Sequence, residues 1–382
     1  EMNIPFVDLQ PSYQDHRQSA EEAIKRVLSS QRFILGPEVS AFEEAVQRYL
    51  GYECACIGTS SGSSALFLSM MAQNIGPGDE VIVPAYTFIA TASAVSLLGA
   101  KPVFVDVEDS SLNMDPRLLE AALSEKTKAV IPVHLFGRSA NLQRINEIVK
   151  SRPGPPVSLI EDCAQAFGAQ YADKPLGSYG HAACFSFFPA KNLGGFGDGG
   201  LISTTDSALG NKIKALRVHG RTAPYYHEWI GINGRLDALQ AAILNTKLPF
   251  IDKWISARVR NAEQYRSCFK SGGLDPCLIS LPPEDDSVYR HTYNQFNLRV
   301  SNGLREPLKA FLAEQGIGTA VYYPIPLPFQ PCYRSLGYSA QNFKVSLAAA
   351  ADSLALPIYP GLKDTEIEYV VDKILGFLKK NA

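Results

Sequence analysis

The segment FSFFPAKNLGG at residues 185–195 changes abruptly from an aromatic, β-rich run into a glycine-rich loop that carries Lys191. It ends a series of short β-rich runs, each of which we expect to be a strand followed by a helical segment: Val81 to Pro84, Lys101 to Asp106, Ala129 to Val133, Val157 to Glu161 and Ala183 to Phe187. This alternation predicts an α/β fold with a mostly parallel sheet covered by helices. Ligands of such sheets bind beyond the carboxyl ends of the strands, where Asp162 and Lys191 fall.

Length and composition predict two domains. The chain has 382 residues, of which 46% are hydrophobic and 19% are charged, so it can bury a large core. A helical pattern from Leu236 to Cys268, broken at Pro249, is interpreted as the bridge between the domains. We therefore expect a large domain over residues 1–248 and a small α+β domain over residues 249–382. In the small domain we expect strands near Tyr293 to Arg299 and Thr319 to Tyr322, and a last helix from Asp364 to Lys379.

Charge and cysteine content exclude several classes of protein. A formal net charge of −2 provides no field to attract nucleic acid or an anionic membrane. The uncharged stretch Val81 to Ala100 imitates a membrane span, but Pro84 and Gly99 interrupt it, and we interpret it as strand, loop and helix. The seven cysteines form neither a CxxC pair nor a metal-ligand cluster with histidine. We expect a cytoplasmic protein with reduced thiols and no metal site.

Lys191 and Asp162 suggest a pyridoxal phosphate (PLP) enzyme. A lysine in an apolar pocket has its ammonium form disfavoured, so its amine can form a Schiff base with a carbonyl compound. An aspartate at a strand end is the usual partner of the cofactor's pyridinium nitrogen, and Asp162 directly follows the run Val157 to Glu161. The alternative for Asp162 is a cap of a following helix.

Further residues are candidates for holding the same cofactor. The turn SSGSS at residues 60–64 precedes a helical run from Ala65 to Ala72, and amide groups at a helix start suit a phosphate. A plain capping turn is the alternative. Gln165 is either a ligand of the cofactor's ring hydroxyl or a surface helix residue, and Phe88 either stacks on the ring or belongs to the core. Ser186 lies on the strand leading to Lys191 and could reach the phosphate.

The ordered motifs of this chain resemble the DegT/DnrJ/EryC1/StrS family of sugar aminotransferases, which are fold-type I PLP enzymes related to aspartate aminotransferase. The resemblance extends over nearly the whole chain. It rests on these segments: PFVDL (5–9), ILGPE (34–38), GPGDEVI (76–82), EDCAQ (161–165), Ser186 to Gly200, GINGRLD (231–237) with QAA (240–242), and YYPIP (322–326). Ser64, where the family often has aspartate, and Ala190, before the lysine, depart from the pattern.

The resemblance implies a set of cofactor-binding residues. Lys191 would be the catalytic residue that forms the Schiff base and moves the proton, and Asp162 would hold the pyridinium nitrogen. Gln165 would bind the ring hydroxyl, and Phe88 would contact the ring face. The phosphate would be bound by Gly62, Ser63 and Ser186. In this family Asn233 reaches the phosphate of the neighbouring subunit's cofactor, which implies a homodimer with shared active sites. A branch of the family that dehydrates sugars has histidine at the lysine position, so Lys191 favours transamination.

The resemblance also implies the reaction. L-glutamate would donate the amino group and a nucleotide-linked keto-sugar would accept it. The motif GINGRLD favours C3 of an NDP-3-keto-6-deoxyhexose, and candidate substrate-binding residues are Arg235, His219, Tyr322 and Tyr323. A loop interrupted by glycine and proline, with His219, Arg221, Tyr225, Tyr226 and His227, either clamps the sugar nucleotide or is a solvated loop at a dimer contact.

Other activities remain open from the sequence. They are amination of an NDP-4-keto-sugar, of a UDP-3-keto-uronate or of a cyclitol. In relatives that use a uronate, the corresponding segment resembles the sequence His-Tyr-Pro, whereas this chain has Tyr322 in place of the histidine. The resemblance therefore favours a 6-deoxy sugar over a uronate. A PLP-binding regulatory protein without turnover is the alternative from another class.

Overall fold

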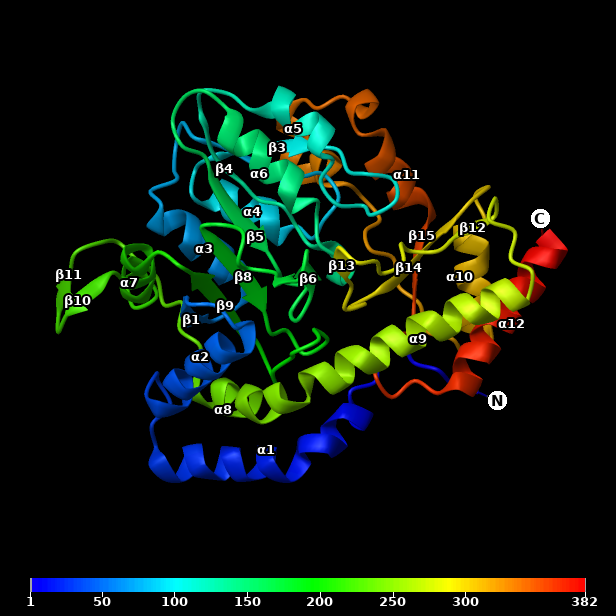
Figure 1. Cartoon of the computed structure of the whole chain (residues 1–382), viewed down its shortest axis with the longest axis horizontal. Coiled ribbons are helices and arrows are strands. Elements are labelled where there is room, and N and C mark those ends of the chain that lie inside the picture. The colour runs from blue at the N-terminus through cyan, green and yellow to red at the C-terminus, as the bar shows by residue number, and fades with distance from the viewer. Residues whose placement is uncertain (1, 382) are drawn as a thin grey trace.

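The computed structural model describes residues 2–381 (Figure 1). A seven-stranded sheet with the order β1-β9-β8-β5-β4-β2-β3 forms its centre. The strands are β1 (Ala55–Thr59), β2 (Glu80–Pro84), β3 (Lys101–Val105), β4 (Thr127–Val130), β5 (Ser158–Asp162), β8 (Ala182–Ser186) and β9 (Gly200–Thr204). The five predicted strands pair in parallel, whereas β9 runs antiparallel to both β8 and β1. The predicted mostly parallel sheet is confirmed.

Helices cover both faces of this sheet. Successive residues of β2 point to opposite sides, so that Ile82 packs in one core while Val81 and Val83 pack in the other. Residues of α2 (Pro37–Leu50), α5 (Pro116–Ala122), α6 (Leu142–Ser151) and α8 (Ala238–Lys247) belong to the first core. Residues of α3 (Gly62–Ala72), α4 (Ala90–Leu97) and α7 (Ser207–Leu216) belong to the second. The result is the predicted three-layer αβα arrangement.

The sequence prediction of a helix after every strand is wrong at two positions. After β5 the chain makes turns and enters two short strands, and after β8 it forms the glycine-rich loop and returns as β9. Both departures follow the strands that carry Asp162 and Lys191. No helix follows directly at these carboxyl ends, which is the edge of a parallel sheet where ligands bind.

The predicted bridge between the domains is a helix pair. Helix α8 ends at Lys247, a 3₁₀ turn over Leu248–Phe250 contains Pro249, and α9 continues over Ile251–Ser271. Figure 1 shows α9 crossing from beneath the large sheet toward the C-terminal part of the chain. The break falls at the proline, as expected for a residue without an amide hydrogen.

A third core lies in the C-terminal part. It combines α9, α10 (Arg305–Glu314) and α12 (Asp364–Asn381) with a sheet of order β12-β14-β15, which is formed by Ile279–Ser280, Phe296–Val300 and Ser353–Leu356. Ile4 also packs in this core. The predicted strand at Thr319 to Tyr322 is wrong, since only Ala320 forms a bridge there, and β15 was not predicted.

The remaining elements surround these cores. Helix α1 (Gln10–Ser30) packs along α8, and α11 (Lys344–Asp352) contacts β14. Small strands are β6 (Gln170–Tyr171), β7 (Lys174–Pro175), β10 (Arg221–Ala223), β11 (Tyr226–His227) and β13 (Tyr289–Arg290). Further 3₁₀ turns span Leu135–Gly137, Leu327–Phe329, Pro331–Leu336 and Ala340–Asn342. Among residues 2–381, no helix has the length and apolar character needed to cross a bilayer.

Candidate active site

The turn over residues 60–64 and the end of β8 lie in contact. Helix α3 begins at Gly62, and the Ser61 hydroxyl accepts a hydrogen bond from the Ser64 amide at 3.0 Å. A Cβ atom on Gly62 would stand 2.7 Å from the Ser186 Cβ, so only glycine permits this approach. The predicted cradle of Gly62, Ser63 and Ser186 is therefore brought together at a helix N-terminus, where amide groups and the helix dipole favour an anion.

Lys191 follows this strand end by five residues. Its amide donates to the Phe188 carbonyl at 2.8 Å, which turns the chain away from the strand direction of β8. Desolvation lowers the pKa of Lys191 to about 8, and the nearby Asp162 carboxylate opposes this shift. A larger fraction of the amine is therefore neutral near physiological pH than for an exposed lysine.

Asp162 is the last residue of β5 and is buried. Its carboxylate accepts hydrogen bonds from the Thr91 hydroxyl at 2.9 Å and from the Ala164 amide at 3.1 Å. Burial nevertheless raises its pKa, since desolvation outweighs these hydrogen bonds and the nearby Lys191 amine, all of which lower the pKa. The alternative of a helix cap is wrong, because turns and not a helix follow β5.

Gln165 is buried, and hydrogen bonds fix the orientation of its side-chain amide. Its side-chain oxygen accepts from the Phe136 amide at 2.7 Å, and its side-chain nitrogen donates to the Tyr323 hydroxyl at 3.0 Å. The alternative of a surface helix residue is therefore wrong. One hydrogen of the side-chain amide remains for a ligand, since the NH₂ group has two.

The two tyrosines after Val321 point to different places. The Tyr323 ring lies 6.2 Å from the Phe88 ring and beside Gln165, whereas the Tyr322 ring packs on Phe6 at 6.0 Å. Phe88 is 54% exposed, so it does not belong to the core. Tyr323 thus lies with the cofactor residues, and Tyr322 lies at a packing contact.

Several supporting residues were not found from the sequence. Thr91 binds Asp162, and Asn294 donates to the Asn192 side chain at 3.1 Å and to the Ala190 carbonyl at 3.5 Å, so that it holds the loop around Lys191. Tyr86 accepts from the Tyr323 amide at 2.6 Å. Thr91 follows Phe88 by three residues, which is the only sequence signal that could have placed it here.

These residues fit pyridoxal phosphate. A buried carboxylate without a cationic partner matches a protonated ring nitrogen, and the glycine at the start of α3 leaves room for a phosphate against Ser186. The Lys191 amine, with its pKa near 8, is available for a Schiff base. The cofactor would supply an electron sink for the substrate carbanion.

A cavity of about 350 Å³ near the β10–β11 hairpin is lined by basic residues, and we call it the basic cavity. Its lining contains two arginines and two histidines and no acidic residue: Ile34, Leu35, Val218, His219, Arg221, Tyr225, His227 and Arg235. The Nε atom of Arg235 is buried without a hydrogen-bond partner. This cavity unites the predicted Arg235 and His219 with the β10–β11 hairpin, and its charge suits an anionic substrate group.

Asn233 lies at the edge between the basic cavity and the phosphate turn. Asn233 is exposed and forms an isolated antiparallel β-bridge with Val218. The carbonyl of the next residue, Gly234, accepts from the Ser60 amide at 3.0 Å. Its side chain is therefore presented outward from a surface that borders the cofactor site.

A buried group of His134, Glu161 and Cys163 has the spacing of metal ligands. Glu161, however, accepts hydrogen bonds from the amides of Gly177, Tyr179 and Gly180, each at 2.8 Å, and contacts His134 Nε2 at 3.1 Å. The other ring nitrogen of His134 accepts from the Ala140 amide at 3.1 Å. Since these atoms are already used, the group supports the end of β5 and does not fit a metal ion.

Comparisons with known proteins agree with this site. Residues 14–375 match the model of the DegT/DnrJ/EryC1/StrS aminotransferase family. The chain is 44% identical to a "Pleiotropic regulatory protein" of Geobacillus stearothermophilus over 100% of both chains. It is 41% identical to UDP-2-acetamido-2-deoxy-3-oxo-D-glucuronate aminotransferase of Pseudomonas aeruginosa, covering 96% of this chain and 98% of that one.

The fold is likewise similar to solved structures. The crystal structure of S. venezuelae DesV in complex with a ketimine intermediate superposes with a TM-score of 0.93 at 36% identity, covering 99% of each chain. The predicted family, fold and cofactor are thereby confirmed.

Proposed function

Because the chain belongs to the DegT/DnrJ/EryC1/StrS aminotransferase family, we propose that this PLP-dependent aminotransferase moves an amino group from L-glutamate to C3 of a nucleotide-linked 3-keto sugar. The observation that carries the proposal is the pairing of a desolvated Lys191 amine with the buried Asp162 carboxylate at adjacent strand ends. The similarity to an aminotransferase named for a 3-oxo sugar supports C3.

The residues of this chain have separate tasks in the proposed reaction. Lys191 would receive and return the proton at the substrate carbon, since its pKa near 8 allows both directions near neutral pH. Asp162 would keep the ring nitrogen protonated, and Gln165 and Tyr323 would orient the ring. Arg235 and Arg221 would bind the negatively charged part of the sugar nucleotide.

We also propose that the active unit is a homodimer with shared sites. Ile34, Tyr225 and Ile230 are 59%, 97% and 92% exposed, and apolar side chains exposed to this degree are typical of an interface. Ile34 and Tyr225 line the basic cavity, and Asn233 is presented beside it. A two-fold contact across this surface would bring Asn233 and the basic cavity of one chain to the cofactor of the other.

A substrate panel tests the function. The PLP-saturated protein would be incubated with L-glutamate and nucleotide-linked 3-keto and 4-keto sugars, with and without a C6 carboxylate, and the products analysed by mass spectrometry and NMR. We expect an amino group at C3 and 2-oxoglutarate as the co-product. Amination at C4, or of a cyclitol alone, would contradict the proposed substrate.

The same protein tests the regulatory alternative. Borohydride reduction followed by peptide mapping should place the cofactor on Lys191, and L-glutamate should convert the bound cofactor to pyridoxamine phosphate in a single turnover. Cofactor on Lys191 without this conversion would favour a regulatory protein that binds PLP but does not turn over. Light scattering coupled to size-exclusion chromatography tests the dimer.

A further inference from the structure

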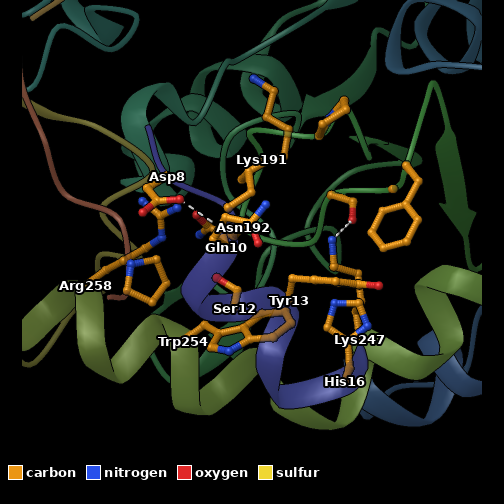
Figure 2. Close-up of a pocket in the computed structure, with 16 residues that line it drawn as sticks. Asp8, Gln10, Ser12, Tyr13, His16, Lys191, Asn192, Lys247, Trp254 and Arg258 are labelled. Carbon is orange, nitrogen blue, oxygen red and sulfur yellow. Dashed lines mark hydrogen bonds between the residues drawn. The ribbon is translucent and has the colours of Figure 1, made fainter. Parts of the chain in front are cut away.

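A cavity of about 290 Å³ lies on the rear of the loop that carries Lys191; we call it the α1 cavity. Figure 2 shows the Lys191 side chain directed away from the other labelled residues, so the amine points out of this space. Asp162, Gln165 and Ser186 are not among the lining residues. Lys191 is itself part of the lining, so the α1 cavity adjoins the cofactor site from behind, on the side opposite to the Lys191 amine.

Two buried cations line the α1 cavity from opposite ends (Figure 2). Lys247 and Arg258 are 8% and 7% exposed, and neither forms a salt bridge with an acidic residue among residues 2–381. Lys247 donates to the Gly194 carbonyl, which leaves two of its three donors unused. A buried cation without a counter-charge is costly, and a bound anion would offset that cost.

The cavity also offers hydrogen-bond acceptors. The Thr246 hydroxyl has a single hydrogen, which it donates to the Ile243 carbonyl at 2.7 Å, so at the 3.3 Å contact with His16 Nδ1 it is the histidine that donates. His16 Nε2 is then a lone-pair acceptor, and this buried atom has no partner. Asp8 adds a carboxylate to the lining of the cavity.

The walls between these groups are aromatic. Tyr13, His16, Phe196 and Trp254 form a continuous set of ring contacts with centroid distances of 5.6 to 6.0 Å. They restrict the space to a small ligand. Cations, acceptors and apolar walls together match a compact carboxylate that also carries a donor.

We propose that the α1 cavity binds a small carboxylate bearing a hydroxyl or amino group, with the carboxylate at Lys247 and the donor group at His16 Nε2. The ligand would contact Asn192, Gly194 and Gly195, and so would touch the Lys191 loop from behind. This site is additional to the sugar aminotransferase site and does not depend on the sugar that is turned over.

A matched pair of ligands tests the proposal on the PLP-saturated protein. L-malate and succinate differ by one hydroxyl group, and isothermal titration calorimetry would measure the binding of each. We expect one L-malate per chain and about tenfold weaker binding of succinate, which cannot donate to His16. Absence of L-malate binding at tens of millimolar, or equal binding of the two compounds, would overturn the proposal.

Three variants locate the bound ligand. Ser12→Trp fills the α1 cavity without altering its cations, and Lys247→Met removes one cation, so both should abolish L-malate binding. Lys253→Met removes an exposed lysine of α9 that pairs with Asp15 outside the cavity and should bind L-malate as the wild type does. The absorbance of bound PLP reports correct folding of each variant. L-malate binding unchanged in Ser12→Trp would contradict the proposed location.

Discussion

The cofactor end of the candidate active site and the basic cavity differ in how their side chains are held. At the cofactor end, Asp162 and Gln165 are buried, and every one of their side-chain oxygens already accepts a hydrogen bond from the protein. In the basic cavity, Tyr225 is 97% exposed, and Arg235 Nε has no partner. The first region is organised before its ligand binds, whereas the second has exposed and unpaired groups that we propose are completed by the substrate or by a second subunit.

This difference predicts what mutation does in each region. Preorganised groups act on the transition state, so their loss should lower kcat. Charges that bind a remote part of the substrate act equally on the ground and transition states, so their loss should raise KM. The following experiments test that division.

Replacement of Asp162 should have the largest effect. Asp162→Asn removes the charge that holds the ring nitrogen protonated, and we expect kcat of the half-reaction with L-glutamate to fall by about 10²- to 10³-fold. Stopped-flow absorbance of the cofactor measures it. The control is Asp106→Asn, another buried carboxylate, which accepts from the Val345 and Ser346 amides away from the site. That variant should lose thermal stability but keep kcat; an unchanged kcat in Asp162→Asn would contradict the assigned role.

Replacement of Arg235 tests the other region. Arg235→Met should raise KM for the sugar nucleotide by about 10- to 100-fold, the value of one or two charge-assisted hydrogen bonds, with kcat nearly unchanged. Steady-state kinetics at two salt concentrations measure it. Arg48→Met, which removes an exposed arginine of α2, is the control and should leave KM unaltered. A fall in kcat at constant KM would instead assign Arg235 to the cofactor end.

The pH dependence of the labelling of Lys191 shows whether its amine is desolvated before a ligand binds. Burial lowers its pKa to about 8, so the amine of the cofactor-free protein is neutral above pH 8 and protonated below it. Its labelling by an acylating reagent should therefore slow about tenfold per pH unit below 8. Mass spectrometry measures the labelling, with the exposed Lys253 as internal reference.

The Asp162→Asn variant sharpens the same measurement. Because the Asp162 carboxylate raises the pKa of Lys191, its removal should move the midpoint to lower pH. A wild-type midpoint above pH 10 would show that Lys191 is not desolvated.

The sequence was sufficient to predict where a residue lies when its position follows from local pattern. Lys191 and Asp162 stood at strand ends, and the glycine of the phosphate turn stood at a helix start, so chain direction alone brought them to one edge of the sheet. The antiparallel β9 escaped prediction because its short run follows a glycine-rich loop that resembles a long connection.

Contacts between distant segments could not be predicted. Asn294 reaches the Lys191 loop across more than 100 residues of chain, and Tyr86 binds Tyr323, which lies 237 residues away in the sequence. No spacing or motif encodes such pairs, since their meeting depends on how two cores pack together. Thr91 is intermediate: its place on the turn after Phe88 is local, but its partner Asp162 lies 71 residues away.

Replacement of Thr91 should have the smallest effect. Thr91→Val keeps the shape of the side chain but removes the hydroxyl that donates to Asp162 at 2.9 Å. The pKa of Asp162, already raised by burial, should rise further, which weakens its hold on the ring nitrogen. One hydrogen bond of about 1 kcal/mol corresponds to about a fivefold lower kcat. Thr91→Ser retains the hydroxyl and should recover most of the activity.

A double variant determines whether Thr91 acts through Asp162. Once Asp162→Asn has removed the carboxylate, Thr91→Val has no charge left to stabilise, so the additional loss in kcat should vanish. If the two losses multiply instead, Thr91 acts through the packing of its buried side chain in α4 and not by holding the carboxylate ionised. The cofactor end would then be rigid for steric reasons, and the contrast with the basic cavity would rest on burial alone.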